Sequence, residues 1–169
     1  MTIETLIKIS PSPASPNETP GDWVEVERKI GKELPSDYKS LIAKYGSGSF
    51  GGFLYLLNPF SKLEGYDYFQ HVQEILNAYK KLKKTKNLAH DVYPSPEGLY
   101  PFAVTDNGDV LYWKIFSDPK EWTIILYNSR HWKYEEYFDG AVGFLLKWLS
   151  GNLGSEIFET PANPSFNSY

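Results

Sequence analysis

The sequence predicts an α+β fold, a single domain in which an antiparallel sheet is packed with helices from both ends of the chain. Three observations lead to this prediction. Apolar residues recur at helical spacing in residues 20–45, consecutive strand-like stretches follow in residues 99–137, and another helical pattern occupies residues 139–150. Helices grouped on either side of consecutive strands are typical of α+β folds. A length of 169 residues suits one domain.

The two ends of the chain are expected to lie outside this domain, which we place at residues 20–151. Residues 1–19 combine a short apolar segment with a Pro/Ser-rich linker, because four prolines between Ser10 and Pro20 can sustain neither a helix nor a central strand. Residues 152–169 are rich in Pro, Asn and Ser and have no regular apolar pattern. We therefore expect them to form a C-terminal tail.

Two short helices are predicted at the start of the domain. The first spans about residues 20–31, beginning at Thr19-Pro20 and ending at Gly31, and the second spans residues 36–45, ending at Gly46. The apolar faces consist of Trp23, Val26 and Ile30 in the first helix and Tyr38, Leu41, Ile42 and Tyr45 in the second.

The glycine-rich segment 46–52 invites comparison with a phosphate-binding loop, but such loops follow a strand and precede a helix. Here a predicted helix precedes the glycines, and the apolar residues 53–57 follow them as a buried strand. We therefore interpret the glycines as turn residues.

A longer helix, about residues 65–84, ends in a cluster of lysines. Its members are Lys80, Lys81, Lys83, Lys84 and Lys86. Positive charge is favourable at the C-terminal end of a helix, and no aromatic stacking platform is interleaved with these lysines in the sequence. We interpret them as a solvated helix end.

Four strands and a closing helix complete the domain. The strands are expected at about residues 99–106, 110–116, 121–127 and 133–137, and the helix is expected to be capped by Asp139 and to end before Gly151. The first two strands are joined by Asp106-Asn107-Gly108-Asp109, a strong hairpin-turn sequence whose acidic residues do not have the spacing of a calcium loop.

The sequence lacks the groups that common catalytic and metal sites need. The absence of cysteine excludes disulfides, thiolate metal sites and cysteine nucleophiles. The three histidines, His71, His90 and His131, lie far apart in the sequence, and none has the spacing of a metal-binding helix. We therefore expect no enzymatic activity, no metal and no cofactor.

Net charge and hydropathy restrict the classes of partner and the cellular location that the sequence allows. A net charge of −4 argues against a general nucleic-acid binder. No stretch approaches the ~18 consecutive apolar residues of a membrane-spanning helix, and the N-terminus is too short and too polar for a signal peptide. A cytoplasmic protein without membrane contact is therefore expected.

Aromatic residues make up 17% of the chain, and 13 of them are tyrosines. Because each buried hydroxyl needs a partner, some of these rings are expected on a recognition surface. We predict a partner-binding face formed by Asp106, Asp109, Tyr134, Glu135, Glu136 and Tyr137. Acidic groups beside aromatic rings suit a basic protein partner.

A longer pattern in the first half carries a family resemblance. It runs Trp23-x-x-x-Glu27-x-x-Ile30-Gly31-x-x-Leu34-Pro35-x-Asp37-Tyr38 and continues through Tyr45-Gly46-x-Gly48 to Asn58-Pro59-Phe60. It resembles the N-terminal motif of the SUKH superfamily, which contains fungal cell-wall and glucan-synthesis regulators and many bacterial immunity proteins. The second half is similar more loosely, at Trp113 and at Phe144-Leu145-Leu146-x-Trp148-Leu149. The residues that match the motif, and whose roles we expect to be structural, are Trp23, Glu27, Gly31, Leu34, Pro35, Asp37, Tyr38, Gly46 and Gly48.

The resemblance implies a non-catalytic domain that binds other proteins. Our first hypothesis is an immunity protein that neutralises a toxin domain with a basic surface, such as a nuclease. The second is a regulatory scaffold for cell-wall or glucan synthesis. The third, from another class, is a small hydrolase that uses His71 or His131 with a carboxylate.

Overall fold

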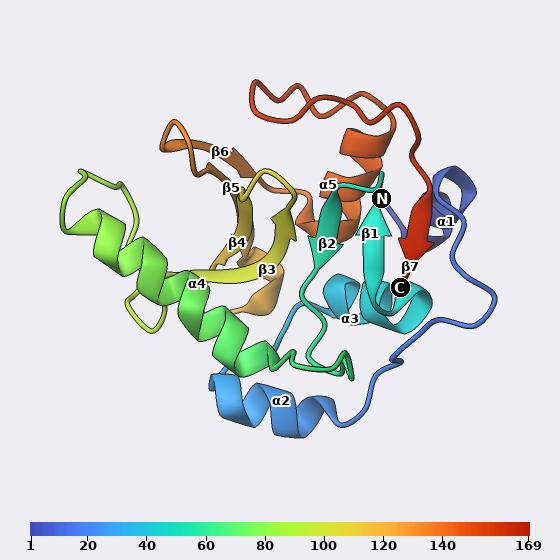
Figure 1. Ribbon diagram of the computed structural model, residues 1–169, viewed down its shortest axis with the longest axis horizontal. Coiled ribbons are helices and arrows are strands. Elements are labelled where there is room, and N and C mark those ends of the chain that lie inside the picture. The colour runs from blue at the N-terminus through green and yellow to red at the C-terminus, as the bar shows by residue number, and fades with distance from the viewer.

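A seven-stranded antiparallel sheet with the strand order β6-β5-β4-β3-β2-β1-β7 runs through the molecule (Figure 1). The computed structural model describes residues 1–169. The strands are β1 (Gly48–Phe50), β2 (Leu54–Leu56), β3 (Leu99–Thr105), β4 (Val110–Lys114), β5 (Thr123–Asn128), β6 (Lys133–Tyr137) and β7 (Phe166–Ser168). The helices are α1 (Ile3–Ile9), α2 (Trp23–Ile30), α3 (Ser36–Tyr45), α4 (Tyr68–Lys83) and α5 (Gly140–Leu149), with a short 3-10 turn, η1 (Pro119–Glu121). The predicted α+β class is confirmed.

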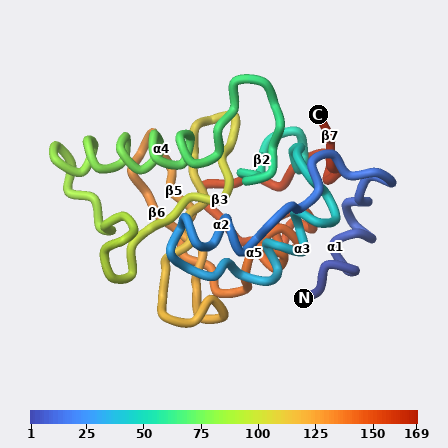
Figure 2. The backbone as a smooth tube through the Cα atoms, turned by 90° about the horizontal axis from the view of Figure 1, so that it is seen from below, coloured from blue at the N-terminus to red at the C-terminus, as the bar shows by residue number.

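The helices cover both faces of the sheet. Helix α4 packs along one face, where it contacts β3, while α1, α3 and α5 pack against one another on the other (Figure 2). No helix is long and apolar enough to span a bilayer.

Aromatic rings form the centre of the core, between α3 and the sheet. The Phe102 and Trp113 rings are stacked with centroids 4.6 Å apart, and the Tyr38 ring meets Trp113 edge-on at 4.8 Å. All three side chains are almost completely buried, and the Tyr38 hydroxyl donates to the Leu57 carbonyl oxygen. Truncating a ring in such a place costs about 3–5 kcal/mol of stability.

Two helices begin later than their sequence patterns indicate. Helix α2 begins at Trp23 because the Asp22 carboxylate accepts from the backbone N–H groups of Val24 and Glu25, at 2.9 and 3.3 Å. Helix α4 begins at Tyr68, where the Asp67 carboxylate accepts from the Gln70 N–H at 2.8 Å. In both cases the nearest aspartate cap fixes the first turn, rather than the preceding glycine or proline.

Both ends of the chain pack against the central part of the fold. Leu6 of α1 is fully buried, and the helix contacts α5 and α3. At the other end, β7 pairs with β1, and the Phe166 ring lies 4.9 Å from the rings of both Tyr45 and Phe50. The segment expected to be a linker therefore connects helix α1 to the rest of the fold, and the segment expected to be a tail supplies the edge strand β7.

The glycine-rich segment is partly strand and partly turn. Residues 48–50 form β1, and Gly51 and Gly52, both with positive φ, turn the chain toward β2. This confirms the turn interpretation for these two glycines and adds a strand that the sequence pattern did not predict.

Candidate interaction surface

The connection between α2 and α3 is held in place by Glu27. Its carboxylate accepts from the Leu34 N–H at 2.8 Å and pairs with the Lys39 ammonium group. Leu34 and Pro35 are buried, so this short connection has a fixed course. Trp23, which we expected in the core, is only half-buried; its ring meets Phe60 edge-on at 4.7 Å and Tyr38 at 6.0 Å.

Asp37 links this connection to the start of α5. One carboxylate oxygen accepts from the Tyr38 N–H at 2.8 Å, and the other accepts from the Val142 N–H at 3.2 Å. The negative charge therefore lies at the N-terminal end of α5, where the helix dipole favours it. Gly140 has a φ of 69°, and a β-carbon there would lie 2.6 Å from the Asp37 oxygen, so the close approach requires glycine.

Asp139, the expected cap of α5, is the residue immediately before the helix but forms no capping hydrogen bond. Its φ and ψ of −93° and 5° differ from the extended conformation that lets a side chain reach back to the helix N–H groups. Its carboxylate instead pairs with the Lys147 ammonium group at 2.5 Å. The cap comes from Asp37, which lies 105 residues before Val142 in the chain.

Three connections converge around a hollow of about 600 Å³, which we call the motif groove. They are residues 33–37 between α2 and α3, residues 118–122 around η1, and residues 138–141 at the start of α5. The buried indoles of Trp113 and Trp122 line it, and Trp122 is fixed by a 3.0 Å hydrogen bond from its Nε1 to the Phe116 carbonyl oxygen.

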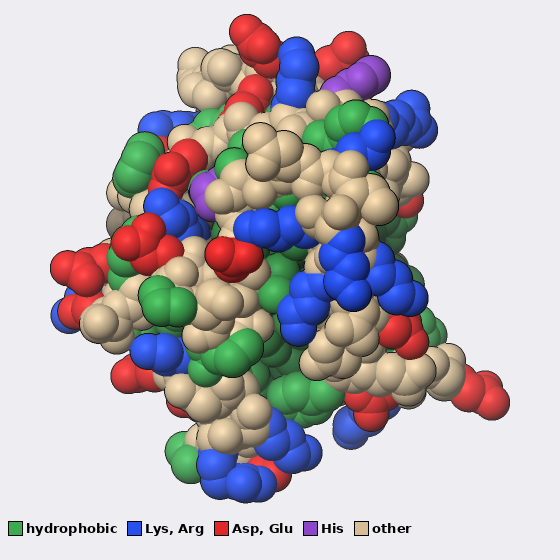
Figure 3. All heavy atoms as spheres, turned by 90° about the vertical axis from the view of Figure 1, so that its left-hand side faces the viewer, with side chains coloured by type: hydrophobic (Ala, Val, Ile, Leu, Met, Phe, Trp, Pro, Cys, Tyr) green, Lys and Arg blue, Asp and Glu red, His purple; other side chains and the backbone are tan.

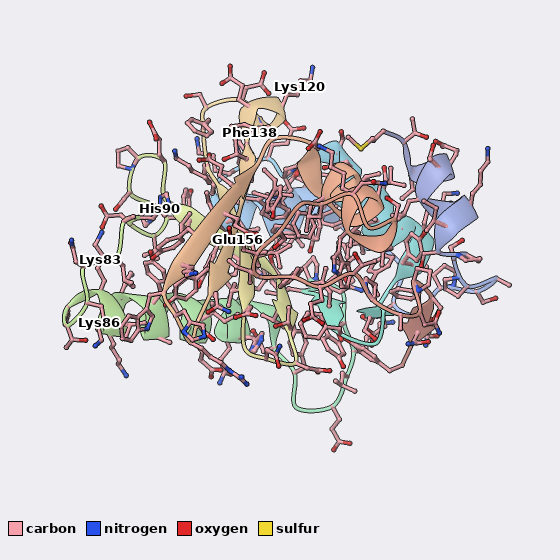
Figure 4. All side chains as sticks on the ribbon, turned by 90° about the horizontal axis from the view of Figure 1, so that it is seen from above. Lys83, Lys86, His90, Lys120, Phe138 and Glu156 are labelled. Atoms are coloured by element: carbon pink, nitrogen blue, oxygen red, sulfur yellow. The ribbon has the colours of Figure 1, made fainter.

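An aromatic ring and free carboxylates stand around the motif groove. Phe138 is 76% exposed, and it lies beside Lys120 at one edge of the molecule (Figure 4). Glu33 forms no ion pair, and the Asp118 carboxylate accepts only from the Lys120 N–H, at 2.9 Å. An aromatic side chain beside unpaired acids above an indole-lined hollow can bind a partner that presents both an apolar side chain and positive charge.

The structure gives the six residues of the predicted binding face different surroundings. Asp109 is buried, and its carboxylate accepts from Asn128 Nδ2 and from the Ser129 N–H, both at 3.1 Å. Asp106 is exposed at the tip of the same turn. The turn and β6 are not neighbours in the sheet, because β5 lies between β4 and β6.

The carboxylates of β6 are used within the chain. Glu135 accepts from the Ser155 hydroxyl at 2.5 Å, from the Tyr137 hydroxyl at 2.6 Å and from the Glu156 N–H at 2.7 Å. Glu136 accepts from the Thr123 hydroxyl at 2.6 Å, and the Tyr134 hydroxyl bonds to that of Tyr79 at 2.7 Å. A binding role for these six residues stays a prediction.

The motif groove was missed in the sequence because its parts are far apart in the chain. Glu33, Asp118 and Phe138 come from three separate connections. The one local signal is Phe138, an aromatic residue placed directly before Asp139-Gly140, where the strand pattern has already ended.

Two motif glycines allow chain segments to approach each other closely. Gly46 has a φ of 68°, and a β-carbon there would lie 1.8 Å from the Asn17 carbonyl oxygen. At Gly48 a β-carbon would lie 2.4 Å from the Asn167 carbonyl oxygen. These two positions therefore join the N-terminal linker and β7 to the edge of the sheet.

The motif residues and the fold agree with a comparison against protein families. The family model described as SUKH_6, SMI1-KNR4 cell-wall, matches residues 21–145. The chain belongs to the SUKH superfamily. No curated protein and no solved structure matches it significantly. The SUKH match includes all of the motif groove, since residues 33–37, 118–122 and 138–141 fall inside it.

The histidines of this SUKH domain do not belong to a cluster of metal-binding side chains. His71 Nδ1 lies 4.0 Å from a Glu74 oxygen on the surface of α4, and burial lowers the pKa of His90. No three His, Asp or Glu side chains lie close enough together to hold a metal ion.

Proposed function

We propose that this SUKH protein is a non-catalytic binding domain that acts as an immunity protein in the cytoplasm, where it neutralises a toxin domain with a basic surface. The observation that carries the proposal is the motif groove, in which the exposed Phe138 ring stands beside the unpaired Glu33 and Asp118 carboxylates. Interfaces with a central aromatic anchor and a charged rim are typical of tight protein complexes.

The surroundings of the motif residues support a binding role rather than catalysis. Glu27 and Asp37 are the charged residues of the motif, and their carboxylates hold the α2–α3 connection and the start of α5. Carboxylates that accept hydrogen bonds from backbone N–H groups in this way position the segments around the groove.

A scaffold role in cell-wall synthesis is the second candidate, and the SMI1-KNR4 cell-wall family to which the chain is similar favours it. Both roles use a protein-binding surface and differ in the partner. A toxin-neutralising protein restores growth when its cognate toxin is produced, whereas a wall regulator changes the resistance of cells to wall-degrading enzymes.

The test is co-expression with the product of the neighbouring gene, followed by co-purification and calorimetry. We expect restored growth and a stable complex. Phe138→Ala should weaken binding by about 30-fold, since loss of a hot-spot aromatic costs about 2 kcal/mol. Reversal of the rim charges, Glu33→Lys with Asp118→Lys, should slow association and increase its sensitivity to salt.

Matched controls locate the effect. Val24→Ala removes another exposed apolar side chain, 74% exposed on α2, and Glu64→Lys reverses an exposed charge in the connection that precedes α4. Both should bind as the parent does. Equal affinity for the groove variants and the parent would place the interface elsewhere. Failure to restore growth, together with altered wall sensitivity after deletion of the gene, would favour the scaffold role.

A further inference from the structure

The end of α4 and the hairpin between β5 and β6 meet at the left-hand side of the molecule in Figure 1. The Lys86 ammonium nitrogen lies 4.1 Å from the centre of the Trp132 ring, although the two residues are far apart in the sequence. Figure 3 shows lysine and arginine side chains gathered over this side, and Figure 4 places Lys86 at the end of α4. We give the name lysine face to Trp132 and the exposed cationic residues close in sequence to the two contacting residues, at the end of α4 and in the hairpin: Lys80, Lys81, Lys84, Lys86, Arg130 and Lys133.

The cations of the lysine face are free. None of the six forms an ion pair, whereas the neighbouring Lys83 pairs with Asp91 at 2.6 Å. Two acids line a hollow together with Trp132 and Lys133: Glu135, whose oxygens are bonded to the C-terminal segment, and the exposed Glu156. The lysine face therefore concentrates positive charge on a chain whose net charge is −4. A net charge summed over the whole chain does not reveal such a local cationic surface.

Trp132 provides the flat aromatic surface that the lysine cluster lacks in the sequence. It is 42% exposed, and its φ of 54° is unusual for a residue with a side chain. The hairpin tip is fixed by two hydrogen bonds of 2.8 Å, from the Trp132 N–H to the Asn128 carbonyl oxygen and from the His131 N–H to Asn128 Oδ1. The turn that carries the indole is thus fixed, and Lys86 lies over one face of the ring, so a base would stack on the other face or displace the Lys86 side chain.

From this juxtaposition we propose that the lysine face binds single-stranded nucleic acid, with Trp132 stacking on a base and the surrounding lysines contacting phosphates. Cationic grooves that combine lysines with an exposed aromatic ring bind single strands because every base has a face to stack. An acidic protein segment would use the charges but gives the indole no planar partner. An anionic membrane would bind through several exposed apolar side chains, whereas Trp132 is the large exposed apolar side chain of the lysine face.

The test uses the full-length protein and a short fluorescent oligothymidine, followed by anisotropy at several salt concentrations. We expect a dissociation constant of about 1–100 μM that weakens steeply with salt, as for non-specific binding to phosphates. Trp132→Ala should weaken binding at least about fivefold, and Trp132→Phe, which keeps a ring, should weaken it less. Lys80→Glu with Lys84→Glu should weaken it further and flatten the slope of log affinity against log salt.

Two variants control for general effects, and each is checked for folding by circular dichroism. Phe138→Ala removes an exposed ring at the motif groove, and Lys120→Glu reverses an exposed charge there, so both should bind the oligonucleotide as the parent does. The proposal is overturned if the oligonucleotide does not bind, or if binding depends on the lysines but not on the ring. Binding to phosphatidylserine vesicles or polyglutamate in preference to the oligonucleotide would overturn it in favour of a membrane or an acidic protein.

Discussion

Strand β6 and the motif groove contain the same kinds of side chain in different surroundings. Both place carboxylates beside aromatic rings, but Glu135 on β6 accepts three hydrogen bonds from its own chain, whereas Glu33 at the groove forms no ion pair. Tyr134 is bonded through its hydroxyl to Tyr79, whereas Phe138 is 76% exposed. The comparison teaches that an acid next to an aromatic ring is equally suited to anchor its own chain and to face a partner; only the local hydrogen-bond partners distinguish the two.

Alkaline pH should have the largest effect, through the buried tyrosines of the core, none of which lines the groove. Burial raises the pKa values of Tyr127, Tyr45 and Tyr100 to about 12. The unfolded chain ionises near pH 10, so stability is complete below about pH 10 and falls as the pH rises toward 12. Urea midpoints measured between about pH 8 and pH 11 should decrease.

Tyr127→Phe is the matched variant for the pH series. The Tyr127 hydroxyl is buried without a hydrogen-bond partner, so its removal should not destabilise the protein at neutral pH and should reduce the loss at high pH. A midpoint that stays constant up to pH 11 would contradict the assignment of these buried hydroxyls.

Asp109→Ala should have the largest effect among the substitutions. It leaves the Asn128 amide and the Ser129 N–H without their acceptor in a buried place, which costs about 2–3 kcal/mol. Denaturant unfolding measures this loss, and Asp109→Asn, which keeps one oxygen, should lose less. Unchanged stability together with impaired partner binding would show that Asp109 belongs to the partner-binding face.

Glu135→Gln should loosen the C-terminal segment that follows α5. The amide can accept fewer of the three hydrogen bonds from Ser155, Glu156 and Tyr137, so we expect a loss of about 1–2 kcal/mol and faster proteolysis after residue 152. Glu136→Gln, at a more exposed position with one short hydrogen bond, is the control and should change both less. Identical proteolysis of the two variants would show that Glu135 does not anchor the segment.

Phe138→Ala should have the smallest effect on stability, within about 0.5 kcal/mol, because the ring is 76% exposed. Thermal unfolding is the measurement. A loss above about 1 kcal/mol would show that the ring packs on the fold, and the groove would then lose its proposed anchor.

Local sequence patterns predicted the elements that depend on residues close together in the sequence. The four apolar residues assigned to the face of α3 are all buried, and β6 has the predicted bounds. Strands β1 and β7 were missed because three residues are too few to show alternation. Helix α1 was missed although Ile3, Leu6 and Ile7 have helical spacing, because its seven residues precede a run of prolines.

The site was less predictable than the fold because its geometry depends on distant contacts. No local pattern indicates that Asp37 caps a helix that begins at Gly140. None indicates that Asn128 and Ser129 donate hydrogen bonds to the buried Asp109 carboxylate. The contact of Lys86 with Trp132 likewise joins a helix end to a hairpin tip. In each case the residue type was evident, and the partner was set by the tertiary fold.

The pairing of β7 with β1 has a consequence for synthesis of the protein on the ribosome. Strand β1 is the first strand in chain order and β7 is the last, yet they are neighbours in the sheet. While the chain grows, the outer edge of β1 presents unpaired backbone groups to other nascent chains, and exposed strand edges of this kind promote aggregation. The protein is therefore most vulnerable in the interval between the emergence of Phe50 and that of Phe166, when a chaperone that shields strand edges would help it most.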